Sequence, residues 1–345
     1  MKDAQGRATA APGDRGRLKR KVLIIAFGSM LAYVALALFA DVRQIGAVSQ
    51  AFDWSLLPVL LALAATNYLS RFVRWEVYLR RQAIRVPLFD SFTIFLAGLF
   101  MSITPGKLGE LLKSFLLRRR HGIPVAESAS VIIGERFTDL TSVLLLSVAG
   151  VWGLGLGVDI FFAGLSLVLV FLLGVFWSAP SRTLLGLAVE VARRRGRAPA
   201  MEGLREKIEL TLRRVRGILR PWPFVLGNGI GAVAWGAEAL AYYLLIDAVG
   251  GDVTLLQAVF VYSVATIAGA VSMLPGGLIA TEGSMMGLML LLNLVPDNAT
   301  GVFVTIVIRF CTLWFAVLVG LLAFLPWRRV AHEEGGLDAL DQDTA

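Results

Sequence analysis

The chain has few charged residues, one cysteine and two histidines. Only 17% of its 345 residues are charged, whereas a soluble domain usually carries about 25%. This shortage excludes a soluble globular enzyme and a disordered chain. Cys311 has no second cysteine with which to form an internal disulfide, which excludes a disulfide scaffold. His121 and His332 are too few and too far apart to predict a metal cluster, and we expect no cofactor.

Apolar sequence and positive charge dominate instead. Hydrophobic residues make up 57% of the chain, and 33 Lys and Arg against 25 Asp and Glu give a net charge of +8. The run 22–40 has 19 almost uncharged residues, longer than a signal-peptide core of about 7–15 residues, so we interpret it as a retained span. Further apolar runs lie at about 54–72, 88–103, 128–150, 160–178, 222–248, 254–274, 278–295 and 301–326. The sequence predicts an all-α polytopic membrane protein.

The distribution of basic residues predicts the topology, because Lys and Arg accumulate in short cytoplasmic loops. Arginine and lysine gather in the tail 1–21, in the segments 71–85, 107–120 and 180–221, and just after the last run, where the tail 328–345 begins. The loops near 41–53, 151–159, 249–253 and 296–300 contain a single basic residue, Arg43. These loops should face outward. We therefore expect a multi-pass protein of the inner (plasma) membrane with both termini in the cytoplasm.

The membrane topology is enough to account for the basic surface, so we expect no nucleic-acid partner. The stretch Met201–Arg220 has an apolar stripe opposite many arginines, which predicts an amphipathic helix on the anionic cytoplasmic leaflet. The expected partners are this leaflet and membrane lipids. The oligomeric state, including a homo-oligomer, stays open.

The segment 88–120 should enter the membrane and return, because both of its ends are predicted to be cytoplasmic. Its limbs, Leu88–Ser102 and Lys107–Arg120, have 15 and 14 residues. At about 1.5 Å per residue they reach roughly 21–23 Å, less than the hydrocarbon core of about 30 Å. We predict a re-entrant hairpin with Thr104-Pro105-Gly106 at its tip.

The two halves of the chain are predicted to form an inverted repeat, 22–157 and 158–327. The second half contains the segment 254–295, which is expected to begin and end outside and to turn at Leu274–Gly277. Its limbs are longer, so it could be re-entrant or cross fully. The halves share an order of features: Pro105-Gly106, Glu110 and Arg136 in the first, and Pro275-Gly276-Gly277, Glu282 and Arg309 in the second. Paired Gly/Pro-interrupted apolar segments are typical of a transporter substrate site, although Pro-Gly pairs also mark ordinary turns.

Several charged residues fall inside apolar runs. Each unpaired charge near the bilayer centre costs about 2.5–3.5 kcal/mol on insertion scales, so these residues must pair or face water. We expect Arg136 to pair locally with Asp139, and Glu135 to take another cation, with Arg309 as the candidate. Two interpretations stay open: ion pairs that only hold the bundle together, or a polar cavity between the repeats. The residues are Glu135, Arg136, Asp139, Glu238 and Arg309.

The first tip has the chemistry of an anion site. A helix that starts after Pro105-Gly106 points its unpaired N–H groups at the membrane interior, which favours an anion. Lys107 adds a full positive charge, and Thr104 could cap the helix or donate to the ligand. A lipid phosphate is the natural anion there. The acidic Glu110 is expected to pair with a cation such as Lys113, Arg74 or an amino head group, or to exchange a proton.

These motifs resemble a known family. Ile103–Glu110 followed by Gly134–Asp139, Met273–Leu278 with Glu282-Gly283, and Arg71–Trp75 are similar to signatures of the flippase-like family. That family includes the transmembrane region of lysylphosphatidylglycerol synthases, also called multiple peptide resistance factors. The resemblance implies a stand-alone lipid-translocating membrane domain, without the fused synthase of two-domain members. A separate lipid-modifying enzyme is then a candidate partner.

The leading hypothesis is a flippase for a phospholipid, an aminoacyl-phospholipid or a polyprenyl-phosphate lipid, and not an enzyme. The alternatives are a membrane enzyme acting on lipid phosphates and a non-transporting accessory subunit. The predicted substrate-binding residues are Arg74, Thr104, Pro105, Gly106, Lys107, Glu110, Glu135, Arg136, Asp139, Pro275, Gly276, Gly277, Glu282 and Arg309.

Overall fold

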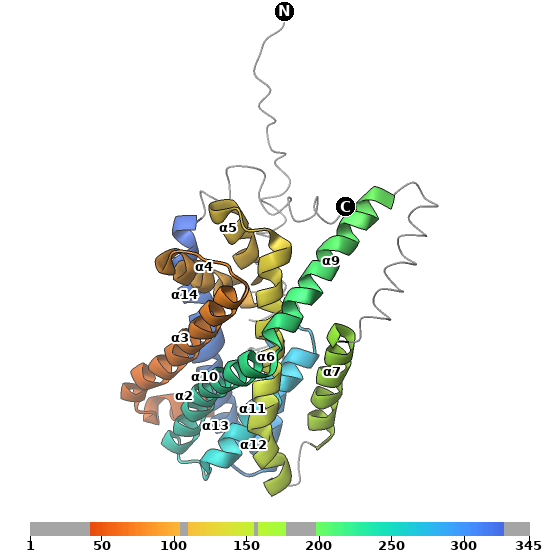
Figure 1. The fold of residues 1–345 in the computed structure, drawn as a ribbon. Helices are drawn as coiled ribbons and strands as arrows, with labels where there is room; N and C mark the ends of the chain where they lie inside the picture. Colours follow the sequence, from red (N-terminus) through yellow and green to blue (C-terminus); the bar gives the residue numbers. More distant parts are fainter. Residues whose placement is uncertain (1–41, 104–109, 155–157, 177–197, 328–345) are drawn as a thin grey trace, which may run out of the picture.

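A computed structural model describes residues 42–103, 110–154, 158–176 and 198–327 (Figure 1). The predicted first span (22–40) and the first tip (Thr104–Lys107) lie outside the described residues, as do both tails. Every regular element in the described ranges is helical, so the all-α prediction is confirmed there. The elements are α2 (Val42–Ala51), η1 (Trp54–Leu56), α3 (Leu57–Arg81), α4 (Leu88–Phe100), η2 (Met101–Ile103), α5 (Leu112–His121), α6 (Val125–Leu154), α7 (Val158–Phe176), α9 (Ala198–Ile218), α10 (Pro221–Ala248), α11 (Leu255–Val271), η4 (Pro275–Gly277), α12 (Ala280–Leu291), α13 (Asn298–Arg309), η5 (Phe310–Trp314), α14 (Phe315–Phe324) and η6 (Leu325–Trp327).

Three segments among the described residues are long and apolar enough to cross a membrane: Trp54–Arg81, Pro221–Ala248 and Asn298–Trp327. Each has at least 28 residues, or about 42 Å of helix, against a hydrocarbon core of about 30 Å. They contain the runs that the sequence predicts as spans at 54–72, 222–248 and 301–326.

Three other apolar helices among the described residues are too short to cross alone. Leu88–Ile103 and Leu255–Val271 are shorter apolar helices, about 24 Å and 26 Å long at 1.5 Å per residue. α12 has 12 residues, or about 18 Å. It begins later and ends earlier than the predicted limb 278–295, because the backbone at Ile279 has a positive φ of 71° and the helix closes at Leu292.

Helix packing places elements from both halves of the chain side by side. α3 packs on α10, and α6 packs on α10 and α11, so α6 and α11 run together through the centre of the molecule (Figure 1). α4 packs on α5 and α14, while α11 packs on α12. The short turns η2 and η4 contact each other, and a Cβ added to Gly276 would lie 3.8 Å from the Cα of Ile103.

The Pro275-Gly276-Gly277 turn depends on its glycines. Gly276 and Gly277 have φ values of 62° and 68°, in the left-handed region where residues with a Cβ are strained. The predicted turn at Leu274–Gly277 is therefore present in the structure as η4, between α11 and α12.

The predicted amphipathic helix over 201–220 is present as α9, but its apolar stripe does not lie wholly outside the protein. Val215 and Leu219 are buried, and the Thr211 hydroxyl donates to the Ala126 carbonyl oxygen over 3.0 Å. Arg214 forms an ion pair of 2.8 Å with Glu127 at the start of α6. The C-terminal half of α9 thus packs on α6, because its apolar residues have a protein surface to cover.

Candidate functional site

A cluster of seven charged residues lies among α3, α5 and α6. We call it the buried charge cluster. α3 supplies two arginines, the start of α5 supplies a lysine and a glutamate just ahead of it, and α6 supplies the rest. Six of the seven residues are buried, and Arg136 is partly exposed. The members are Arg71, Arg74, Glu110, Lys113, Glu135, Arg136 and Asp139.

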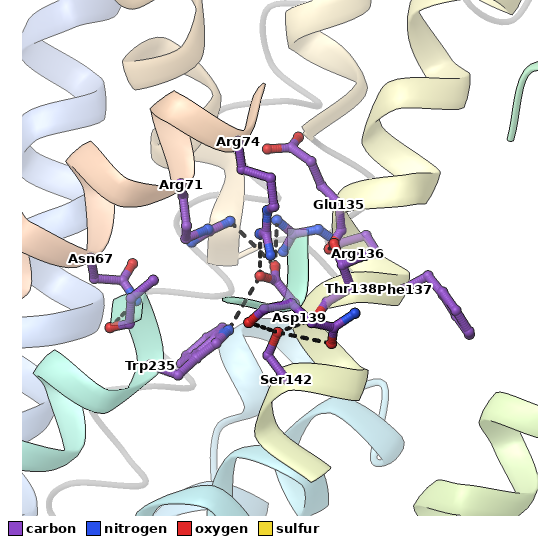
Figure 2. Close-up of polar contacts among 12 residues, drawn as sticks. Asn67, Arg71, Arg74, Glu135, Arg136, Phe137, Thr138, Asp139, Ser142 and Trp235 are labelled. Atoms are coloured by element: carbon purple, nitrogen blue, oxygen red, sulfur yellow. Dashed lines mark hydrogen bonds and ion pairs between the residues drawn. The ribbon is translucent and has the colours of Figure 1, made fainter. Parts of the chain in front are cut away.

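Asp139 is the centre of this cluster. Arg74 Nη2 donates to Asp139 Oδ1, and Trp235 Nε1 on α10 donates to the same oxygen over 3.2 Å. Oδ2 lies 2.9 Å from Arg136 Nη2 and 3.7 Å from Arg71 Nη2. Figure 2 shows the arginines of α3 and the arginine of α6 converging on this carboxylate from opposite sides. The predicted Arg136–Asp139 pair is confirmed.

Lys113 forms the second node of the cluster. Its Nζ lies 2.7 Å from Glu135 Oε2 and 3.6 Å from Glu110 Oε2, and its side chain is 2% exposed. The ammonium also sits 4.5 Å from the centre of the Trp75 ring, within cation–π range. The lysine stem passes over Gly98, where an added Cβ would lie 2.6 Å from Lys113 Cγ. A glycine at this position is therefore needed to admit the lysine.

Glu110 connects the two nodes. Its Oε1 lies 3.0 Å from Arg136 Nη1, while its Oε2 faces Lys113. The expected pairing of Glu110 with Lys113 is confirmed. The expected pairing of Glu135 with Arg309 is wrong, because Glu135 binds Lys113 and Arg309 binds Glu282.

A second group of charges surrounds the η4 turn. Arg309 Nε lies 2.7 Å from Glu282 Oε1, and Arg309 Nη2 donates to the Gly276 carbonyl oxygen over 2.7 Å. Arg309 thereby ties the end of α13 to α12 and to the turn. On α10, Glu238 accepts a hydrogen bond of 2.6 Å from the Tyr262 hydroxyl of α11.

The residues directly after Arg309 form a π-helical turn, η5, in an otherwise continuous span. The Tyr68 hydroxyl of α3 donates to the Thr312 carbonyl oxygen of this turn over 2.8 Å. Such turns are rare and occur frequently at functional sites.

The predicted site residues therefore separate into three sets. Arg74, Glu110, Glu135, Arg136 and Asp139 belong to the buried charge cluster. Pro275, Gly276, Gly277, Glu282 and Arg309 belong to the second group. Thr104, Pro105, Gly106 and Lys107 lie outside the described residues.

Sequence reasoning left three cluster contacts out of the predicted site. Arg71 lies three positions before Arg74 and so shares its helix face, a signal that could have identified it. Lys113 lies three positions after Glu110 and offered the same signal. The sequence offered no such signal for Trp235, because this residue reaches Asp139 only through the packing of α10 on α6.

The buried charge cluster is incompletely hydrogen-bonded. Its members carry four positive and three negative charges, and Glu238 of α10 acts on Arg71 as a further negative charge. Arg74 is fully buried, yet its Nε and Nη1 have no hydrogen-bond partner among the described residues, and neither has Arg71 Nε. Guanidinium groups bind phosphate and carboxylate strongly, so the cluster can hold an anion. The part of the chain that the structure describes contains no group of His, Cys, Asp and Glu suited to a metal ion.

Comparison with known proteins gives consistent matches over most of the chain. Residues 21–320 match the family model described as the lysylphosphatidylglycerol synthase TM region. A UPF0104 membrane protein of Methanothermobacter thermautotrophicus is 25% identical over 293 residues, which cover 78% of this chain and 84% of that protein. A UPF0104 membrane protein of Pyrococcus horikoshii is 24% identical over 339 residues, covering 90% and 98% of the two chains.

Proposed function

The chain belongs to the family of lysylphosphatidylglycerol synthase transmembrane regions, and from that premise we propose that it moves a phosphate-bearing lipid across the inner membrane. The lipid class is a phospholipid, an aminoacyl-phospholipid or a polyprenyl-phosphate lipid. The observation that carries the proposal is the buried charge cluster, in which the guanidinium groups of Arg71 and Arg74 hold N–H donors with no hydrogen-bond partner among the described residues.

The energetics of the cluster favour an anionic ligand. A buried donor left without a hydrogen-bond partner costs about 1–3 kcal/mol, and more for a charged group. A lipid phosphate would accept hydrogen bonds from these N–H groups of Arg71 and Arg74. Structural ion pairing alone would leave them unsatisfied. We therefore assign the head-group phosphate to Arg71, Arg74 and Arg136.

We further propose that α4–α5 and α11–α12 are re-entrant hairpins of an inverted repeat. Three observations support this. Leu88–Ile103 and α12 are shorter than the hydrocarbon core, η2 and η4 contact each other, and Arg309 holds the second turn through Gly276. Transporters built from inverted repeats bind substrate where such broken helices meet. The first tip, Thr104–Lys107, stays a candidate for head-group binding.

The transport cycle that follows from this architecture alternates between two openings. The repeats 22–157 and 158–327 would open in turn to the cytoplasmic and outer sides, with both termini cytoplasmic. The head group would cross along the charged surface while the acyl chains stay in lipid. Because Asp139 of α6 pairs with Arg74 of α3, exchange of that carboxylate for phosphate would make the contact between the two helices depend on the bound head group.

The test is lipid translocation by the purified protein in proteoliposomes. Fluorescent phosphatidylglycerol is placed in one leaflet, and its appearance in the other is followed with a membrane-impermeant quencher. We expect Arg74→Gln to lower the initial rate about tenfold or more, since a hydrogen bond to a charged group contributes about 1.5–3 kcal/mol. Arg74→Lys, which keeps the charge, should retain part of the rate.

Lys207→Gln is the matched control, because Lys207 is an exposed cation of α9 outside the cluster. It should translocate like the wild-type protein. The proposal fails if the wild-type protein moves neither this lipid nor a labelled aminoacyl-phosphatidylglycerol or polyprenyl-phosphate lipid faster than empty liposomes do. The assignment of the phosphate fails if folded Arg74→Gln protein keeps the wild-type rate.

A further inference from the structure

A recess lies where the C-terminal end of α3 meets the segment leading into α4. Its volume is about 480 Å³, within the usual range of about 300–1,000 Å³ for small-molecule sites. None of its lining residues belongs to the buried charge cluster. They are Glu76, Arg80, Ile84, Arg85, Val86 and Leu88.

The polar side of this recess carries excess positive charge. Arg80 and Arg85 are exposed, and Glu76 is the one carboxylate among the residues that line the recess. Glu76 is already engaged, because it accepts a hydrogen bond from the Ser91 hydroxyl and lies 3.5 Å from Arg80 Nε. The guanidinium groups at the rim therefore retain N–H donors for an anion.

The apolar side of the recess continues into a surface that faces lipid. Leu69, Val73, Glu76 and Arg80 follow one another at steps of four, three and four residues, so they share one face of α3. Leu69 and Val73 are 54% and 52% exposed, and Leu88 at the mouth of the recess is 58% exposed. On a helix long enough to span the membrane, exposed apolar side chains contact acyl chains. The recess lies where this stripe changes from apolar to charged.

We infer that this recess binds the phosphodiester head group of an anionic phospholipid from the cytoplasmic leaflet. Arg80 and Arg85 contact the phosphate, Ile84 and Val86 contact the glycerol backbone, and an acyl chain follows Leu69 and Val73. Basic residues at a helix end mark the cytoplasmic side, where anionic lipids attract them. The inference concerns a resident lipid and does not depend on the proposed transport.

The experiment is native mass spectrometry of the full-length protein in detergent, titrated with dioleoyl-phosphatidylglycerol or dioleoyl-phosphatidylcholine. We expect the wild-type protein to retain phosphatidylglycerol preferentially. An arginine near an anionic lipid surface contributes enough for about a fivefold change in affinity, so R80A/R85A should bind it about 25-fold more weakly. R205A/R213A removes the same charge from α9 and should leave this binding unchanged.

A second variant separates the shape of the recess from its charge. Val86→Trp fills the recess without altering any charged group, and we expect it to weaken phosphatidylglycerol binding by itself. Equal loss in R205A/R213A would show attraction to the whole basic surface and would overturn the inference. So would an unchanged affinity in R80A/R85A or in Val86→Trp, or binding of soluble glycerophosphorylglycerol as tight as that of the lipid.

Discussion

Removal of the Asp139 carboxylate should destabilise the protein more than removal of any exposed acid. Asp139→Asn keeps the volume of the side chain but leaves Arg74, which is fully buried, and Arg71 without their common counter-charge. Breaking a buried ion pair by removing one partner costs about 3–5 kcal/mol, because the remaining charge is left uncompensated. We therefore expect Asp139→Asn to lower the free energy of unfolding by about that amount.

The pairing itself is measured by a double-mutant cycle. Arg74→Gln also breaks the pair, but the double variant Arg74→Gln/Asp139→Asn removes both charges and restores the net charge of the cluster. The double variant should lose at least about 1 kcal/mol less unfolding free energy than the two single variants lose together, as expected for residues in contact. Equilibrium unfolding of the purified protein in mixed micelles, followed by circular dichroism, gives all four free energies.

An exposed pair on α9 provides the control. Arg205 Nε lies 2.9 Å from Glu209 Oε1 at i,i+4, with side chains 39% and 30% exposed. Pairs of this kind contribute only about 0.3–0.5 kcal/mol, so Glu209→Gln should change stability little. Additive costs in the Asp139 cycle, or a cost of Asp139→Asn as small as that of Glu209→Gln, would refute the account of the cluster.

Two further predictions concern glycines at helix contacts. A Cβ at Gly231 would overlap with the Ser142 hydroxyl oxygen, whereas nothing lies within 4 Å of a Cβ at Gly229 on the same helix. Gly231→Ala should therefore lower the free energy of unfolding by about 1–3 kcal/mol. Gly229→Ala should raise it by up to about 1 kcal/mol, because alanine has the higher helix propensity. A Cβ at Gly320 would overlap with the backbone of Phe100, so Gly320→Ala should separate α14 from α4 and lower the yield of folded protein in gel filtration. Gly229→Ala should not lower that yield. Equal behaviour of the paired variants in unfolding or gel filtration would contradict this reading of the contacts.

The sequence predicted the elements and the local charge pairs, because both depend on short spacings. Apolar runs identified the three long helical segments, and the i,i+3 spacing identified the pair Arg136–Asp139. For Glu110, Lys113 was one of several candidate cations. The turn at Pro275–Gly277 could be located because glycines occupy its two left-handed positions.

Contacts between distant helices could not be predicted in this way. Arg74 and Asp139 are 65 residues apart, and Trp235 and Asp139 are 96 apart, so their meeting depends on how α3, α6 and α10 pack. The wrong pairing of Glu135 with Arg309 has the same origin. That prediction matched the two residues by the sign of their charges alone, whereas the packing of α5 on α6 places Lys113 beside Glu135.

The π-helical turn at Phe310–Trp314 determines which neighbouring helix each later residue of the last span faces. Each residue of an α-helix advances by about 100°, and a widened turn accommodates one residue more than a regular turn. Arg309, ahead of the turn, faces Glu282, while Gly320, beyond it, faces the backbone of α4. Deleting one residue from this turn would rotate Gly320 away from α4 and put a bulkier side chain in its place. The extra residue therefore lets one continuous helical segment direct Arg309 at α12 and Gly320 at α4, two contacts that a regular helix would not align.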